Sequence, residues 1–268
     1  MRCLVSAAAL VLAMVPAPAS AWGNTGHRIT GAIAERHLDR RARAAIRTIL
    51  GAETLAQAST WPDFMRQSPD PFWRTAGAFH SVVVPDDGAY DAAHAPLEGD
   101  AVTALRRFGA TVRDRKAPLA ERQRALRFIV HIVGDLHQPL HACNGRDHCG
   151  GDVQVTFFGT PMNLHAVWDY ALIDHQQLAF SEWAAWLDAP LTRERVALWS
   201  QTDPAVWIAE SAALRDATYP GVATDLGKDY AFANTPILED RLAKAGVRIA
   251  AYLNRLFDKH PPSSETFH

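Results

Sequence analysis

The sequence predicts an all-α protein, and three observations support that fold class. Apolar residues recur at helical spacings over long stretches, strand-like alternation is confined to one short segment, and a proline falls where one such helix should end. With 48% apolar and 21% charged residues, the 268-residue chain has a globular composition, not a disordered or fibrous one. Its formal net charge of −2 gives no overall attraction to polyanions, so such a ligand would need a local feature such as metal ions.

Helices are expected in seven segments. In the first, 26–49, Ile29, Ile33 and Ile46 recur at helical intervals; the third should end before Pro139, because proline lacks an amide donor. The segments are 26–49, 99–115, 119–137, 162–175, 178–187, 192–215 and 235–258. Residues 152–158 could form one arm of a hairpin, 84–98 a surface loop and 260–268 a disordered tail. No repeat or long linker divides the chain, so we expect one domain over 22–268.

The first 21 residues have the pattern of a secretory signal peptide. Arg2 precedes an apolar run over 4–15, and Ala19-Ser20-Ala21 provides small residues at a cleavage site. The alternative, a membrane anchor, would need about 20 apolar residues, and this run is shorter. We therefore expect the mature protein to begin at Trp22, to be secreted or periplasmic, and to have no membrane-spanning segment.

Two cysteines remain after that cleavage, Cys143 and Cys149, within a loop rich in Gly, Asn and Asp. In an oxidising compartment they should form a disulfide. A zinc site with His141 or His148 is the rival interpretation, but the spacing lacks the tight C-x2-C form of structural zinc sites.

Two His-x-x-x-Asp pairs suggest a metal centre. His131 and Asp135, and likewise His165 and Asp169, are four residues apart and so share one face of a helix. Each pair offers the neutral nitrogen and anionic oxygen that zinc accepts. A single pair of this kind is also typical of a core hydrogen bond, but two pairs in apolar helices, with His141 beside them, favour a metal site.

The mature N-terminus offers further ligands. Cleavage would expose the α-amine of Trp22, whose pKa of about 7.7–8.0 lets a divalent cation displace its proton, and His27 follows closely. Asp63 and His80 are two more candidates. Taken singly, each has a simpler interpretation: Trp22 as a core side chain, His27 as a helix-start contact and Asp63 as a cap.

Together these motifs resemble those of the secreted zinc-dependent single-strand-specific nucleases, the fungal and plant bifunctional nuclease and 3′-nucleotidase family, related in fold to zinc-dependent phospholipase C. They are WGNTGH at 22–27, WPD at 61–63, FH at 79–80, HIVGDLHQPLH at 131–141 and HAVWD at 165–169. Beyond residue 169 only length and helical character agree. The resemblance implies a single-domain helical phospholipase C/nuclease-type fold with three zinc ions in a cleft.

The resemblance also implies that nine residues hold these ions. The three sets are Asp63, His80, His131 and Asp135 for one ion; His141, His165 and Asp169 for a second; and Trp22 (amine and carbonyl), His27 and the shared Asp135 for the third.

The family mechanism implies that a hydroxide shared by two zinc ions attacks phosphorus in line, and that the ion of His141, His165 and Asp169 stabilises the departing 3′-oxygen. Products would be 5′-phosphorylated nucleotides, or a nucleoside and phosphate from a 3′-mononucleotide. Asp63 and Asp135 are then catalytic, as is Arg66, which stands where the family has a cationic phosphate-binding side chain. Arg66 could equally be a solvated charge at a helix end.

Single-strand preference would follow from stacking a splayed base on an aromatic side chain beside the metals. The chain departs from the fungal pattern here, since Ser81 stands where a stacking aromatic is expected and Val83 offers no side-chain hydrogen bond to a base. We do not choose among four replacements: Phe64, Tyr170, Phe157 and Phe158. His137 is expected to orient other groups and not to bind metal.

Two other functions fit less well. A zinc-dependent phospholipase C would have Glu where this chain has Asp169, and a non-catalytic periplasmic zinc-binding protein needs closed coordination. The expected substrates are therefore single-stranded DNA or RNA and nucleotides, and we expect a monomer without an obligate protein partner.

Overall fold

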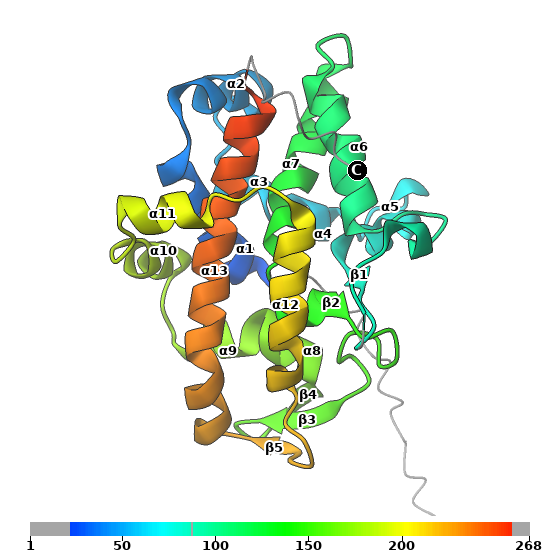
Figure 1. Ribbon diagram of the computed structural model, residues 1–268, viewed down its shortest axis with the longest axis vertical. Helices are drawn as coiled ribbons and strands as arrows, with labels where there is room; N and C mark the ends of the chain where they lie inside the picture. The colour runs from blue at the N-terminus through cyan, green and yellow to red at the C-terminus, as the bar shows by residue number, and fades with distance from the viewer. Residues whose placement is uncertain (1–21, 87, 259–268) are drawn as a thin grey trace, which may run out of the picture.

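Helices dominate the computed structural model, which describes residues 22–86 and 88–258 (Figure 1). The expected signal peptide and the expected tail at 260–268 lie outside the described residues. Helices α6, α7, α12 and α13 run roughly along the long axis of the molecule. The α-helices are α1 (Asn24–His37), α2 (Arg40–Leu50), α3 (Leu55–Ala58), α4 (Trp61–Met65), α5 (Phe72–Ala76), α6 (Ala101–Arg113), α7 (Leu119–Asp135), α8 (Leu164–Ala166), α9 (Leu172–His175), α10 (Phe180–Asp188), α11 (Arg193–Trp199), α12 (Pro204–Thr218) and α13 (Lys228–Leu256).

Short 3-10 and π segments and two small sheets complete the described fold. The 3-10 segments are η1 (Gly77–His80), η2 (Ala92–His94) and η3 (Pro139–His141), and the π segment is η4 (Val167–Ala171). Strand β1 (Val82–Val83) pairs in parallel with β2 (Ala142–Cys143). Strand β3 (Gln154–Phe157) lies between β4 (Thr160–Asn163), antiparallel to it, and β5 (Asp225–Leu226), parallel to it. The hairpin expected at 152–158 is therefore present.

Two of the predicted helices are each divided in two. The segment expected as one helix over 26–49 breaks at Leu38 and Asp39, where the Asp39 side chain accepts a hydrogen bond from the Ala42 amide and starts α2. The segment expected over 192–215 breaks before α12, where Asp203 caps the helix and Pro204 occupies its first turn. Both breaks follow cap signals that apolar periodicity alone does not contain.

An aromatic core supports the short helices α4 and α5 and the segment η1. The ring of Phe128, on α7, stacks on Phe108 and Trp73 at centroid distances of 4.5 and 5.6 Å, and Phe79 meets it edge-on at 6.1 Å. Trp61 packs edge-on against Trp73 at 5.2 Å. Trp61 lies two residues before Asp63, and Phe79 immediately precedes His80, so this packing positions two of the predicted ligands.

Close helix packing positions α1, the helix that contains His27. A Cβ at Gly246 of α13 would lie 2.5 Å from the Ile33 side chain, and one at Gly31 would lie 2.6 Å from the Leu55 carbonyl oxygen. Only glycine fits at these two contacts, so α1 is held tightly between α13 and α3. A second buried cluster, which includes Trp22, Leu140 and Trp168, lies at the N-terminal end of α1.

Candidate metal centre

Three groups of His and Asp side chains converge on the N-terminal end of α1 and the C-terminal end of α7. In each group the potential ligand atoms lie within 4.8 Å of one another. The groups are His27, Asp63 and His131; His80, His131 and Asp135; and His141, His165 and Asp169. All eight side chains proposed from the sequence are therefore brought together.

Asp135 belongs to the second group, also approaches His27 of the first, and is fully buried. Its Oδ2 is 3.2 Å from both His80 Nδ1 and His131 Nε2, and its Oδ1 is 3.3 Å from His27 Nε2. Asp63 completes the cluster, with Oδ1 3.9 Å from His131 Nε2. One carboxylate that faces two sets of imidazoles matches the sharing of Asp135 inferred from the sequence.

The third group joins His141 of η3 with His165 of α8 and Asp169 of η4. His165 Nε2 lies 3.0 Å from Asp169 Oδ2, and His141 Nε2 lies 3.7 Å from Asp169 Oδ1. Asp169 is in the π segment η4, an irregularity that helices often have at functional sites. His141 also links the groups, because its Nδ1 is 3.9 Å from Asp135 Oδ1.

Backbone carbonyls fix the tautomer of three histidines. The Nδ1 atoms of His131, His141 and His165 lie 2.7, 2.8 and 2.7 Å from the carbonyl oxygens of Ser59, His80 and Cys149 respectively. A ring nitrogen that donates to a carbonyl leaves the other nitrogen as a lone-pair ligand. Each of these rings therefore presents Nε2 to its group, as an orienting partner does in metal sites.

The donor set passes a test of fit to metal cations. Among the described residues, several buried polar atoms here have no hydrogen-bond partner, although buried polar groups are nearly always satisfied. These atoms are His27 Nδ1 and Nε2, Asp63 Oδ1, His80 Nε2, Asp135 Oδ1 and His141 Nε2. Imidazole nitrogens and carboxylate oxygens are zinc's usual ligands.

The electrostatics of the cluster depend on its two carboxylates. Burial lowers the pKa of His27 and of His80, so both favour the neutral form that binds metal. Burial also acts to lower the pKa of His131, but the carboxylates of Asp135 and Asp63 outweigh it and raise that pKa to about 9. Burial would raise the pKa of Asp135, yet the neighbouring His131 holds it well below its ordinary value.

Trp22 and Gly23 bind the start of the described chain to this centre. The Trp22 indole is buried and donates to the Gly134 carbonyl oxygen at 2.9 Å, one residue before Asp135. The Gly23 amide donates to the Asp169 carbonyl oxygen at 2.7 Å. Trp22 is therefore a core side chain that packs next to Asp135, and its neighbour Gly23 contacts Asp169. The start of the described chain thus lies close to the predicted ligands.

Gln138 is a buried polar residue that the sequence did not single out. Its Nε2 donates to Asp169 Oδ1 at 2.9 Å, and its Oε1 accepts from the Leu140 amide. It lies in the turn between α7 and η3, which joins Asp135 to His141. Its only sequence signal is its place between those two ligands, inside HIVGDLHQPLH.

Charged residues of α12 and α13 hold that same turn. Arg241, fully buried, donates to the His137 carbonyl oxygen and to Glu210, and Arg248 donates to Glu210 and to His137 Nε2. His137 Nδ1 in turn lies 2.7 Å from the Val133 carbonyl oxygen. Both nitrogens of His137 are thus engaged outside the metal groups, with Val133 and Arg248, and neither of these residues is a predicted ligand.

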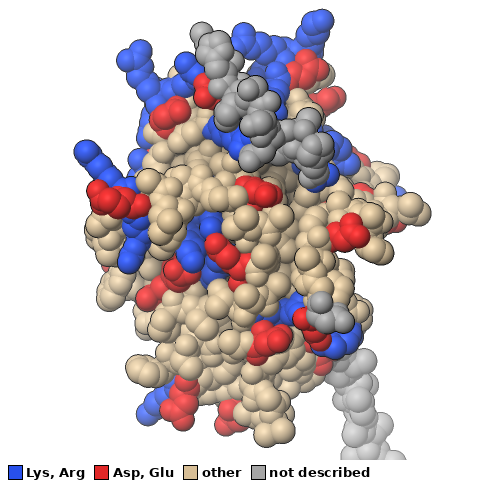
Figure 2. Space-filling model, in the orientation of Figure 1, with Lys and Arg blue, Asp and Glu red and all other residues tan. Residues whose placement is uncertain are grey.

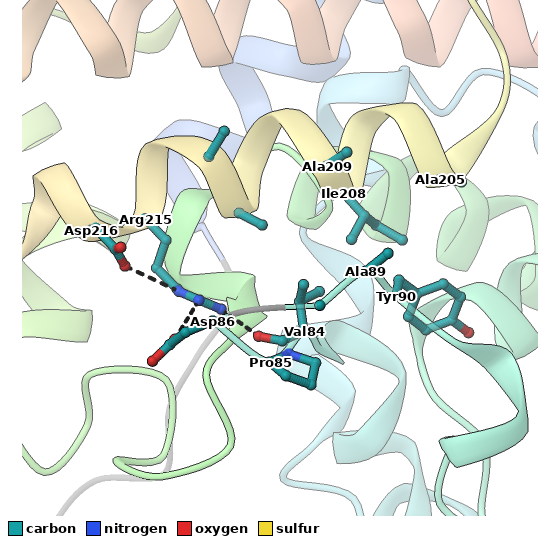
Figure 3. A pocket seen from close by; sticks show the side chains of 13 residues that line it. Val84, Pro85, Asp86, Ala89, Tyr90, Ala205, Ile208, Ala209, Arg215 and Asp216 are labelled. Atoms are coloured by element: carbon teal, nitrogen blue, oxygen red, sulfur yellow. Dashed lines mark hydrogen bonds and ion pairs between the residues drawn. The ribbon is translucent and has the colours of Figure 1, made fainter.

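Arg215 of α12 fixes the two strands that follow His80 and His141. Its Nη1 donates to the carbonyl oxygens of Val84 and Ala142, each at 2.7 Å, and its Nη2 donates to Asp86 (Figure 3). A pocket of about 380 Å³ lies beside it, between loop residues 84–86 and 88–90 and the alanine-rich face of α12. None of the predicted metal ligands lines this pocket.

The disulfide interpretation of the cysteines is confirmed, since Cys143 and Cys149 are bonded. His148, the rival zinc ligand, instead lies 2.7 Å from Asp152. The Cys149 carbonyl oxygen is the one that faces His165 Nδ1, so the disulfide loop contributes to the third group.

The residues expected to contact substrate differ in exposure. Arg66 ends α4 with Nη1 3.7 Å from Asp63 Oδ1. Phe64 is 70% exposed and Tyr170 is 43% exposed, and each directly follows a predicted ligand. Phe157 is buried, and Phe158 stacks on His175 at 4.1 Å.

Comparisons with known proteins agree with this centre. The S1/P1 nuclease family model matches residues 22–258. Endonuclease 4 of Arabidopsis thaliana is 31% identical over 290 residues, covering 94% of each chain, and nuclease S1 of Aspergillus oryzae is 29% identical over 93% of this chain and 96% of its own. Alpha toxin from Clostridium absonum has the same fold, with a TM-score of 0.56 at 15% identity over 92% of this chain and 66% of the toxin.

Proposed function

The chain belongs to the S1/P1 nuclease family, and from this premise we propose that it is a zinc-dependent nuclease. It would hydrolyse single-stranded DNA and RNA, and 3′-mononucleotides, at the bond between the 3′-oxygen and phosphorus. The observation that carries the proposal is the convergence of three buried His/Asp groups on one another in a chain with this ancestry.

Nine residues would hold three zinc ions, divided as the sequence motifs imply. The described side chains support two of the sets directly, because Asp63, His80, His131 and Asp135 cluster together, as do His141, His165 and Asp169. The third set adds the main chain of Trp22 to His27 and Asp135. Bound zinc supplies Lewis acidity, which neutralises phosphoryl charge and makes water nucleophilic near neutral pH.

The protein's own side chains orient the reaction. Asp135 and Asp63 would hold metal ions against the scissile phosphate; Asp135 is fully buried, whereas Asp63 is partly exposed. Arg66 presents a guanidinium beside Asp63, where its paired donors suit two phosphoryl oxygens. The group at Asp169 lies beside the first two, with His141 Nδ1 3.9 Å from Asp135 Oδ1, and its ion would stabilise the departing 3′-oxygen.

Base recognition would use Phe64 or Tyr170 in place of the aromatic that position 81 lacks. Both rings are exposed, and each is adjacent in sequence to a ligand carboxylate. Of the other two candidates, Phe157 is buried and Phe158 is already stacked on His175. Stacking on an exposed ring contributes about 1–3 kcal/mol per base and requires an unpaired base, which would favour single strands.

Signal-peptide cleavage during export would supply the last of the proposed ligands. Cleavage between Ala21 and Trp22 frees the amine that the third set uses, and the disulfide of Cys143 with Cys149 suits an oxidising compartment. We propose a secreted or periplasmic monomer, one domain from residue 22, that needs no protein partner. Among the described residues, no helix is long and apolar enough to cross a membrane.

Processed protein that begins at Trp22 tests the proposal. It should release nucleotides from denatured DNA and RNA and phosphate from 3′-AMP, and it should not hydrolyse phosphatidylcholine. Asp135→Asn should abolish these activities, whereas His94→Gln, a change to an exposed histidine that belongs to none of the three groups, should preserve them. Phosphatidylcholine hydrolysis would instead identify a phospholipase, and fully metal-loaded protein without either activity would identify a metal-binding protein.

A further inference from the structure

Positive charge gathers at one end of this nearly neutral molecule. Segments 39–50 and 113–124 together carry a net charge of +6, whereas the whole chain carries −2. In Figure 2 blue side chains concentrate at the top of the view, over the end where α2 and the α6–α7 turn lie in Figure 1. We call this region the basic end, and its cationic residues are Arg40, Arg41, Arg43, Arg47, Arg113, Arg115, Lys116, Arg122 and Arg124.

The two segments form one surface because α2 is joined to α7. Gln123 Nε2 donates to the Ile49 carbonyl oxygen at 2.9 Å, and Arg127 forms a bidentate pair with Glu53, just after α2. The α6–α7 turn therefore lies beside the arginines of α2 and does not form a separate patch.

Much of this charge has no compensating partner. Arg41 pairs with Asp258, and Arg43 donates to the carbonyl oxygen of Glu35. Over residues 22–86 and 88–258, no acidic side chain forms an ion pair with Arg40, Arg47 or Lys116, and all three are exposed. Arg115 is likewise exposed and lacks such a pair.

Local helix stability does not account for the arginines of α2. Arg40, Arg41 and Arg43 lie in its first turn, which has no acidic residue, although the positive end of the helix dipole disfavours cations. The other face of α2 is buried through Ala42, Ile46, Ile49 and Leu50. On the exposed face of α2 the apolar side chain is the small Ala44, and Leu119 is the large apolar side chain exposed in segment 113–124, so the basic end offers charge and little apolar surface to insert into a lipid bilayer.

We propose that the basic end binds the phosphate backbone of a single strand whose scissile bond lies at the metal centre, an inference that rests on the proposed function. Helix α7 joins the two sites, since it begins at the basic end and reaches His131 twelve residues later. At 1.5 Å per residue that is about 18 Å. A strand stacked at the axial rise of one duplex strand, about 3.4 Å per nucleotide, needs roughly six nucleotides to reach both sites, and a more extended strand needs fewer.

A triple variant, Arg40→Gln, Arg47→Gln and Lys116→Gln, tests this anchor in the metal-loaded enzyme. For a 20-nucleotide strand, KM at about 0.1 M salt should rise roughly 10- to 100-fold. The dependence of log(1/KM) on log[salt] should become shallower by about 2, since each lost phosphate contact contributes about 0.7 for single strands. Turnover of 3′-AMP and of dinucleotides should not change, because these substrates are too short to reach the basic end.

A matched variant removes three exposed charges elsewhere: Arg193→Gln and Arg195→Gln on α11, and Lys228→Gln at the start of α13. It should leave KM for the long strand unchanged. An equal rise in both variants would show a general charge effect and overturn the anchor, as would no change in the first. Loss of binding to vesicles of anionic phospholipid, with strand kinetics unaltered, would overturn it in favour of a membrane surface. Wild-type protein that cleaves neither long nor short substrates would instead refute the proposed function.

Discussion

Replacement of Gln138 by Met should weaken the binding of one of the three proposed zinc ions, the one at His141, His165 and Asp169. The Gln138 side chain is fully buried, and its donor to Asp169 Oδ1 at 2.9 Å is a charge-assisted bond. Such bonds contribute about 1.5–3 kcal/mol, which corresponds to about a 10- to 100-fold change in affinity, as expected for a partner that orients a metal ligand. Only the group of His141, His165 and Asp169 depends on this contact.

The assay is competition with a chelator, followed by zinc analysis and by the absorption spectrum of the cobalt-substituted protein. One ion should dissociate at a 10- to 100-fold lower chelator concentration, and the other two should be retained as in wild type. Ser211→Ala is the matched control, because Ser211 also binds this turn, at the Leu136 carbonyl oxygen, but does not contact a ligand.

A second variant separates metal orientation from support of the turn. Gln138→Glu keeps the acceptor for the Leu140 amide and removes the donor to Asp169. If the hydrogen bond from Gln138 Nε2 to Asp169 orients this ligand, both variants should lower the affinity for the same ion. If Gln138 only supports the turn, the Glu variant should bind all three ions as wild type does. That second result, or uniform weakening of all three ions, would refute the reasoning.

Three further predictions follow from the same structure. A residue retained ahead of Trp22 should block the amine, so tagged protein should contain one zinc fewer and lose most activity; equal metal content would contradict this. Burial would raise the pKa of Glu210, but hydrogen bonds from Arg248 and Arg241 lower it to about 2, so this carboxylate stabilises the fold above pH 4.5 and the contribution is lost as pH falls toward 2. The stability difference between metal-free wild type and Glu210→Gln should shrink over that window, by no more than about 2 kcal/mol after screening, and a constant difference would refute the link. Replacing both disulfide cysteines by Ser should cost about 2 kcal/mol, the entropy of a short loop, seen in the denaturation midpoint.

Sequence periodicity predicted the long helices because each buries one apolar face. It did not predict α3, α4 and α5, which have only four or five residues; α3 packs against α1 at Gly31, and α4 and α5 are held by the aromatic core around Phe128. It also missed the break before α2, although Asp39 is a typical N-cap. Short or interrupted elements depend on tertiary contacts and caps more than on a repeating pattern.

In the candidate centre, too, local spacing predicts some contacts, and others depend on tertiary structure. His131 with Asp135 could be paired from spacing alone, because residues four apart share a helix face. The approach of His27 and Asp63 to Asp135 joins segments more than 70 residues apart, and only the family motifs anticipated it. Gln138 and Arg241 carried no local signal, because their roles depend on which buried atoms they face.

Anomalous diffraction at the zinc edge, from crystals of protein processed to begin at Trp22, tests the central claim most directly. Three peaks are predicted, two of them flanking the carboxylate of Asp135 and one between His141, His165 and Asp169, with zinc–nitrogen distances of about 2.0–2.1 Å. Peaks elsewhere, or none in protein that still degrades single strands, would contradict the account.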